Sequence, residues 1–178
     1  MASLVVYCSR AGSNWVEDNV ANLKVGNNEI VANYIHSKVG GDLFKIETSR
    51  KYTDEYYKAT EEAKEEKNNQ ERPEVLNLPE NLDKYDTIYL CYPIWWGTCP
   101  MAVFTFLEHY DFASKTIIPF CSHEGSGKSE SVDDIKKTCP NAIIKDYFET
   151  RGYKCQTLIK DNVLQNEINN WLEKTAEQ

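Results

Sequence analysis

The stretch TIYLCYPIWWG, residues 87–97, joins a short apolar run to a loop that carries two adjacent tryptophans. The run over 87–92 has no polar alternation, which is typical of a strand buried on both faces of a sheet. A proline and a glycine stand on either side of Trp95 and Trp96 and fix this loop. A rigid aromatic wall at the end of a strand suits a flat aromatic ligand. Packing into the core or into a dimer contact is the alternative for either tryptophan.

Strand and helix patterns alternate along the rest of the chain. Apolar runs predict strands over 3–8, 43–46, 116–121 and, less regularly, 142–148. Helical spacing of apolar residues predicts helices within 30–39, 101–107, 132–135 and 164–172, and the charged segment 54–69 predicts a solvent-facing helix. The alternation predicts a single α/β domain over residues 1–178, a three-layer sandwich with a five-stranded parallel sheet. A ligand would lie beyond the carboxyl ends of the strands, at the loops after the first, third and fourth strands.

The composition indicates a globular protein with an acidic surface. There are 28 acidic against 20 basic side chains, a formal charge of −8, so the surface repels nucleic acid and anionic lipid and attracts basic protein partners. No apolar stretch approaches the roughly 20 residues that cross a bilayer, and the start MASLVVYCSR lacks a signal-peptide pattern, so we expect a cytoplasmic protein. The six cysteines are widely spaced, which predicts small buried residues rather than disulfides or a metal site.

The loop after the first strand has the features of an anion site. Gly26, Asn27 and Asn28 precede a predicted helix, and the unpaired backbone N–H groups at a helix N-terminus favour an anion such as phosphate. Capping of the helix by Asn27 or Asn28, with Gly26 as a turn, is the alternative. The loop also offers a hydroxyl, a positive charge and room for close backbone approach, from Ser9, Arg10 and Gly12.

The loop after the fourth strand, SHEGSGKS over residues 122–129, is again polar and rich in glycine. Gly125 and Gly127 can present backbone amides to the polar edge of a ring. His123 is either a proton donor or an inert loop residue, and Glu124 has the same standing.

Two common nucleotide motifs are missing from these loops. No Gly-Lys-Ser/Thr follows the glycines of the first loop, and no G-x-G-x-x-G occurs there, so ATP and a Rossmann-bound NAD both lose support. A phosphorylation receiver domain would need acidic residues where this chain has Cys8-Ser9 and Tyr92-Pro93.

The three loops together resemble those of the flavodoxin-like family, in particular bacterial flavodoxins with W-W-G in the second loop. The resembling segments are Ser-Arg-Ala-Gly with Gly-Asn-Asn-Glu, then Tyr-Pro-Ile-Trp-Trp-Gly, then Ser-His-Glu-Gly-Ser-Gly, and the resemblance runs over nearly the whole chain. It implies an FMN-binding domain with strand order 2-1-3-4-5. It implies that the phosphate is held by the first loop, through Ser9, Arg10, Asn27 and Asn28, with Gly12 in the same loop. It implies that the isoalloxazine ring lies against Pro93, Ile94, Trp95, Trp96 and Gly97, with Ser122, His123, Gly125 and Gly127 at its polar edge.

The first loop departs from the pattern of the family. The usual phosphate loop is contiguous, whereas residues 13–25 separate Gly12 from Gly26 here, and Asn28 stands where a threonine is usual. Trp15 lies within this insertion and either covers the flavin or anchors the loop.

Two functions are compatible with such a domain, and in both the FMN carries the redox chemistry without a catalytic side chain. The first is an electron carrier that passes low-potential electrons between redox proteins by transient docking of its acidic surface. The second is an NAD(P)H-dependent FMN or quinone reductase of the same fold. A reductase requires an open face above the flavin, so packing of Trp15 and Tyr153 over the ring would argue against it.

Overall fold

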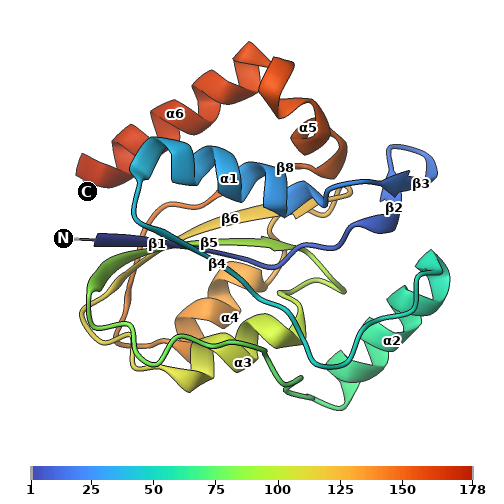
Figure 1. Ribbon diagram of the computed structural model, residues 1–178, viewed down its shortest axis with the longest axis horizontal. Coiled ribbons are helices and arrows are strands. Elements are labelled where there is room, and N and C mark those ends of the chain that lie inside the picture. Colours follow the sequence, from blue (N-terminus) through green and yellow to red (C-terminus); the bar gives the residue numbers. More distant parts are fainter. Residues whose placement is uncertain (1, 178) are drawn as a thin grey trace.

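The computed structural model describes residues 2–177 and has one central sheet with helices on both sides (Figure 1). The strands of this sheet are β1 (Ala2–Tyr7), β4 (Asp42–Lys45), β5 (Tyr85–Pro93), β6 (Thr116–His123), β7 (Ile143–Ile144) and β8 (Phe148–Arg151). They are arranged in the order β4-β1-β5-β6-β7, with β8 also paired to β6, and neighbouring strands are parallel. Because β7 and β8 together occupy the fifth position, the predicted α/β architecture and the order 2-1-3-4-5 are confirmed.

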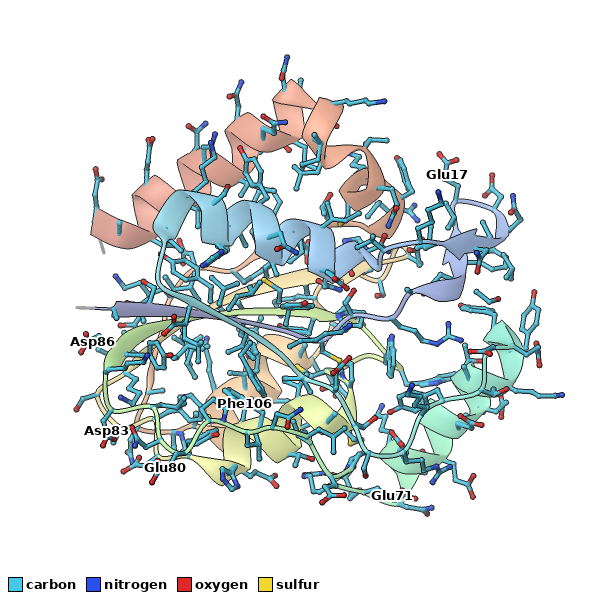
Figure 2. The ribbon with its side chains drawn as sticks, viewed as in Figure 1. Glu17, Glu71, Glu80, Asp83, Asp86 and Phe106 are labelled. Carbon is cyan, nitrogen blue, oxygen red and sulfur yellow. The ribbon has the colours of Figure 1, made fainter. Side chains whose placement is uncertain are left out.

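Alternate residues of the strands fill a separate core on each face of the sheet. Leu4 and Val6 pack on the side of α3 (Met101–His109) and α4 (Ser131–Thr138). Val5 and Tyr7 pack on the side of α1 (Asn27–Val39) and α6 (Asn162–Glu177). Figure 2 shows Phe106 pointing from α3 into the first of these cores, where it is fully buried. Burial on both faces explains why the strand sequences are continuously apolar.

The predicted helices are present as α1, α2 (Tyr56–Asn68), α3, α4 and α6, whereas α5 (Gly152–Thr157) and the 3-10 turn η1 (Leu158–Lys160) were not predicted. Helix α2 covers neither face of the sheet. It lies beyond the carboxyl ends of the strands, at the lower right of Figure 1. Ala59, Ala63 and Glu66 form its buried side, and the rest of α2 is largely exposed, as its charge predicts.

The segment read as an insertion, residues 13–25, folds mostly into a hairpin that the sequence did not predict. Strands β2 (Gly12–Val16) and β3 (Asn19–Leu23) pair antiparallel, from Gly12 opposite Leu23 to Val16 opposite Asn19. Two-stranded hairpins are marginally stable in water. This one is held by Asn14, whose Nδ2 donates to the Arg10 carbonyl at 2.9 Å, and it lies above α2 at the same end of the sheet (Figure 1).

The prediction of one continuous strand over 142–148 is wrong. Lys145 still donates its backbone N–H to Ile117 of β6 at 3.0 Å. The next carbonyl, that of Asp146, accepts the indole N–H of Trp171 at 2.8 Å, and Lys145 Nζ reaches the Thr175 carbonyl at 2.7 Å. These contacts to α6 draw the backbone away from β6, and pairing resumes only at Phe148.

The cysteines belong to the two cores, as small buried residues. All six cysteines are buried and unpaired. No helix within residues 2–177 has the length and the apolar character that a bilayer crossing requires.

Candidate functional site

The two tryptophans stand on a tight turn directly after β5. The Trp95 N–H donates to the Thr98 carbonyl at 2.9 Å, and the Thr98 N–H donates back at 3.3 Å. The central residues, Trp96 and Gly97, have φ angles of 53° and 82°. This left-handed region is ordinary for glycine but costs another residue about 1–3 kcal/mol. Such strain clusters at functional sites, where the surrounding structure holds it.

Helix α2 holds Trp96 in this strained position. The indole Nε1 donates to the Thr60 carbonyl at 2.8 Å, and Lys67 Nζ donates to the Trp96 carbonyl at 2.5 Å. The ammonium of Lys64 lies 4.9 Å from the centroid of the Trp96 ring. Since Trp96 is 43% exposed, these contacts to α2 fix its orientation more than burial does.

Trp95 contacts Tyr52, which lies in the segment that leads into α2. Its ring meets the ring of Tyr52 edge-on, with centroids 5.3 Å apart. The Tyr52 hydroxyl donates to Glu66 of α2 at 2.5 Å, and burial is the main cause that raises the pKa of this glutamate. Both tryptophans are therefore coupled to α2, Trp96 through a backbone carbonyl and Trp95 through the half-buried Tyr52.

A cavity of about 180 Å³ opens between the turn, α2 and the start of the hairpin. Its walls are mainly aromatic and aliphatic, and they include Arg10, Tyr56, Thr60, Ile94, Trp95 and Trp96. On the hairpin, the ring of Trp15 approaches the ring of Tyr56, with centroids 6.2 Å apart. This contact joins the hairpin to α2 next to Tyr56, which lines the cavity.

The N-terminus of α1 directs its backbone N–H groups toward the first loop. Gly26 is the N-cap residue and has no side chain to cap the helix. Asn27 Oδ1 accepts from Gln156 and Asn28 Oδ1 has no partner among the described residues, so the capping by Asn27 or Asn28 considered above is absent. The Ser9 Oγ accepts the N–H of Glu29 at 3.1 Å. A Cβ at position 26 would lie 2.1 Å from this oxygen, so only glycine lets the first loop wrap so closely around the helix end.

Asn28 links the first loop to the third inside the protein. Its Nδ2 donates to the Ser122 Oγ at 2.9 Å, and the two residues are only 1% and 3% exposed. The Oδ1 atom of Asn28 is buried and has no hydrogen-bond partner among the described residues. An unpaired buried acceptor costs about 1–3 kcal/mol, so this oxygen is suited to a donor from a bound ligand.

Arg10 points away from the end of α1. Its guanidinium donates to the Ser13 carbonyl, to the Thr53 carbonyl at 2.9 Å and to the Asp54 carbonyl at 3.3 Å. Arg10 therefore ties the first loop to the segment that leads into α2, and its charge lies at the aromatic cavity.

His123 shapes the third loop. Its Nδ1 accepts the Gly125 N–H at 3.0 Å, which requires this ring nitrogen to be unprotonated. Partial burial is the main cause that lowers the pKa of His123 below its ordinary value; the charge of Glu149 opposes this shift and that of Arg151 adds to it. Of the two roles left open by the sequence, the geometry favours support of the loop.

Glu124 extends from the third loop back toward α1. A Cβ placed on Gly152 would lie 2.3 Å from the Glu124 Oε1 and 2.6 Å from the Asn27 Nδ2. Both polar groups therefore pack against the backbone of Gly152, which has no side chain, at the start of α5. Burial raises the pKa of Glu124 to about 7, although Arg151 acts in the opposite direction.

The structure brings several of the predicted site residues into two neighbouring groups. Ser9, Asn28 and Ser122 meet at the end of α1, and Ile94, Trp95 and Trp96 line the cavity. Pro93, the last residue of β5, pairs with Ser122 and joins the two groups. The other predicted residues are more peripheral: Asn27 accepts from Gln156 of α5 at 2.7 Å, Gly12 begins β2, and Gly125 and Gly127 lie in the third loop. Tyr56 was missed, because a tyrosine on a charged helix gives no sequence signal.

Comparison with known proteins places this geometry in a family. A family model described as flavodoxin matches residues 19–175. The chain belongs to the flavodoxin family. The family assignment agrees with the strand order and with the position of the three loops.

Solved structures share the fold of this flavodoxin family member. A protein of Bacteroides uniformis assigned as a flavoprotein is 26% identical, with a TM-score of 0.71 over 90% of this chain and 98% of that chain. A Lactobacillus acidophilus flavoprotein in complex with FMN is 16% identical, with a TM-score of 0.62 over 89% and 97%. An NADH:FMN oxidoreductase in its apo form is 12% identical, with a TM-score of 0.56 over 98% and 88%. No curated protein sequence matches significantly.

Proposed function

We propose that this member of the flavodoxin family binds FMN and carries electrons between larger redox proteins. One observation carries the proposal: a helix N-terminus with a glycine N-cap and an aromatic cavity lie at the same end of the sheet, with a buried unpaired acceptor close to that helix end. These features suit, respectively, the phosphate, the flat ring and the hydroxyl groups of FMN.

The residues at the helix end fit the polar part of FMN. The N–H groups in the first turn of α1, together with the Ser9 hydroxyl that already accepts one of them, suit the phosphate. The Asn28 Oδ1 needs a donor, and a hydroxyl can supply one whereas an ionised phosphate oxygen cannot. We therefore assign Asn28 to a hydroxyl of the FMN side chain rather than to the phosphate.

The cavity fits the ring. Trp95, Trp96 and Tyr56 offer aromatic faces and edges there, and such contacts contribute about 0.5–1.5 kcal/mol each beyond the burial of area. The contact of Trp15 with Tyr56 lies next to the cavity and would limit the access of water to a bound ring. The third loop, shaped by the contact of His123 with Gly125, would lie at the polar edge of the ring.

Bound FMN would supply reversible electron transfer at its ring. The residues of the chain bind and orient it, and their charge biases its potential. A net charge of −8 disfavours further negative charge on the ring and lowers the potential of the last electron, each ~60 mV corresponding to about 1.4 kcal/mol for one electron.

The surroundings of the site suit a basic redox partner. Figure 2 shows Glu17 at the tip of the hairpin, pointing away from the protein. Glu61 and Glu65 are exposed on α2, on the other side of the cavity. Carboxylates around the site attract a basic protein surface and accelerate brief encounters.

The second candidate is an NAD(P)H-dependent FMN or quinone reductase, and the position of Arg10 is the observation in its favour. A guanidinium at the cavity suits an anionic substrate group. The contact between Trp15 and Tyr56 favours the carrier instead, because a reductase needs an open face for its second substrate.

Electron transfer measured with purified protein loaded with FMN distinguishes the two functions. A carrier passes electrons from a flavodoxin reductase to cytochrome c and oxidises no NAD(P)H by itself. Steady NAD(P)H oxidation with a quinone, in the absence of any reductase, would instead establish the enzyme. The same assays without FMN are the control.

A further inference from the structure

The carboxyl group of Glu124 lies between the ends of two helices. The Glu124 Oε1 and the Asn27 Nδ2 approach the same backbone position, where a side chain on Gly152 would meet them at 2.3 Å and 2.6 Å. Asn27 is the first residue of α1 and Gly152 the first of α5. Glu124 therefore holds an acid beside the helix end to which we assign the phosphate of FMN.

The groups around Glu124 balance the negative charge of its carboxylate only in part. Arg151 of β8 contributes a nearby positive charge, but its hydrogen bond of 2.7 Å goes to the backbone carbonyl of Glu124. Tyr56 of α2 and Cys155 of α5 lie near the carboxylate, since burial and then the charge of Glu124 raise the pKa of both groups. Asn27 of α1 is neutral, and so is the His123 ring while its Nδ1 accepts from Gly125.

Glu124 is exposed as a residue, but the partial burial of its carboxyl group is the main cause that shifts its ionisation. This burial raises the pKa of Glu124 to about 7 in the protein without FMN, with Arg151 opposing it. A phosphate at the end of α1 would add a negative charge nearby, and a like charge raises the pKa of a carboxyl group further. Glu124 would then be ionised at mildly alkaline pH in the free protein and protonated in the complex.

We propose that FMN binding is coupled to the uptake of one proton by the Glu124 carboxylate, which then lies beside the phosphate as a neutral acid. The proposal rests on the FMN site described above. The proton comes from the solution, no other bond is made or broken, and the neutral acid can donate to an oxygen of the phosphate. Binding and protonation are linked, so FMN affinity falls as the pH rises through the pKa of the free protein.

Equilibrium titration with FMN tests this, using the wild type and Glu124→Gln. The wild type should bind FMN at least about tenfold more weakly at about pH 8.5 than at about pH 6. Glu124→Gln, which stays neutral, should keep the tighter affinity at both. Glu130→Gln is the matched control and should behave as the wild type, because Glu130 is an acid next to the same loop but, unlike Glu124, is not among the atoms that approach Gly152. The phosphate of FMN ionises equally in all variants, so the difference between them isolates Glu124.

A second measurement needs no variant. Calorimetry of FMN binding to the wild type at about pH 7.5, in two buffers of different ionisation enthalpy, should show net proton uptake. Riboflavin, which lacks the phosphate, should bind with less proton uptake. Equal pH dependence in the wild type and Glu124→Gln, or no proton uptake, would overturn the coupling and leave FMN binding intact. A wild type that binds no FMN at either pH would overturn the proposed function as well.

Discussion

The indole N–H of Trp96 donates to the backbone carbonyl of Thr60 at 2.8 Å, across 36 positions of sequence. This contact explains why α2 stands at the end of the sheet instead of covering one of its faces. Helix α2 holds a tryptophan whose backbone is in the left-handed region, and it completes the cavity with Tyr56. The aromatic wall therefore depends on a helix whose sequence is mostly charged.

Replacing Trp96 should weaken FMN binding more than it weakens the fold. Trp96→Ala removes an exposed ring that lines the cavity, so we expect the dissociation constant to rise roughly tenfold, from an aromatic contact of about 1.5 kcal/mol. Quenching of flavin fluorescence measures it. Unchanged affinity would remove Trp96 from the ring site.

Trp171→Ala is the matched control, and we expect it to weaken the fold more than it weakens FMN binding. Trp171 is 7% exposed and packs against Phe148 and Phe120, with centroids 5.6 Å and 6.4 Å away. Its truncation should cost about 3–5 kcal/mol of unfolding free energy, measured by urea denaturation, with FMN affinity retained under folding conditions. A loss below about 1 kcal/mol would show that this core is not packed as described.

Arg10→Ala should weaken FMN and riboflavin by a similar factor. The guanidinium holds the carbonyls of Thr53 and Asp54 ahead of α2, so its loss loosens the cavity rather than the phosphate site. Arg10→Lys should rescue little, because an ammonium group lacks the planar fork that reaches several carbonyls at once. A much greater loss for FMN than for riboflavin would restore the phosphate contact expected from the sequence.

Gly26→Ala should destabilise the protein by about 1–3 kcal/mol, as overpacking does. The new Cβ would lie 2.8 Å from the backbone oxygen of Arg10, which cannot swing aside. Gly152→Ala is the comparison, since its Cβ meets only the ends of two side chains. We expect Gly152→Ala to cost less in thermal denaturation yet to disturb FMN binding. Equal stability of Gly26→Ala and the wild type would contradict the tight wrapping of the first loop.

Lowering the pH should break the hydrogen bond between His123 and Gly125 that shapes the third loop. Folding lowers the pKa of His123 from its ordinary value of 6.5, so the neutral ring stabilises the fold. This contribution is complete above the ordinary value and is lost as the pH falls through the lower pKa of the folded state. The Gly125 amide, which donates to Nδ1, should therefore lose protection at acid pH in hydrogen-exchange NMR, where protection is the intrinsic exchange rate at each pH divided by the measured rate. His123→Ala should abolish this pH dependence of protection, and His109→Ala, at an exposed helix end, should preserve it. Protection of the Gly125 amide that stays constant with pH in the wild type would contradict the contact.

The sequence predicted the sheet because buried parallel strands carry continuous apolar runs, as in 87–92. It missed the hairpin because the turn between Val16 and Asn19 is Glu-Asp, without the Asn-Gly or Asp-Gly signal of tight hairpins. The split of the fifth strand depends on Trp171 and Thr175, which lie about 25 to 30 positions away. Local patterns do not contain such contacts.

The candidate site likewise contains features that the local sequence predicts and features that depend on distant contacts. The loops were predictable because their positions follow from the strand order, and Trp95 and Trp96 do line a cavity there. The direction of Arg10 was not predictable, because the carbonyls that bind it lie 43 and 44 positions away. The contribution of Tyr56 likewise depends on where α2 packs.

Titration of the purified protein with FMN, followed by flavin fluorescence and the visible spectrum, tests the central claim most directly. We predict saturation at one FMN per chain, with a dissociation constant below about 1 μM and strong quenching of the flavin by the adjacent tryptophans. A folded protein that leaves FMN fluorescence unchanged and elutes colourless after incubation with FMN would contradict the account.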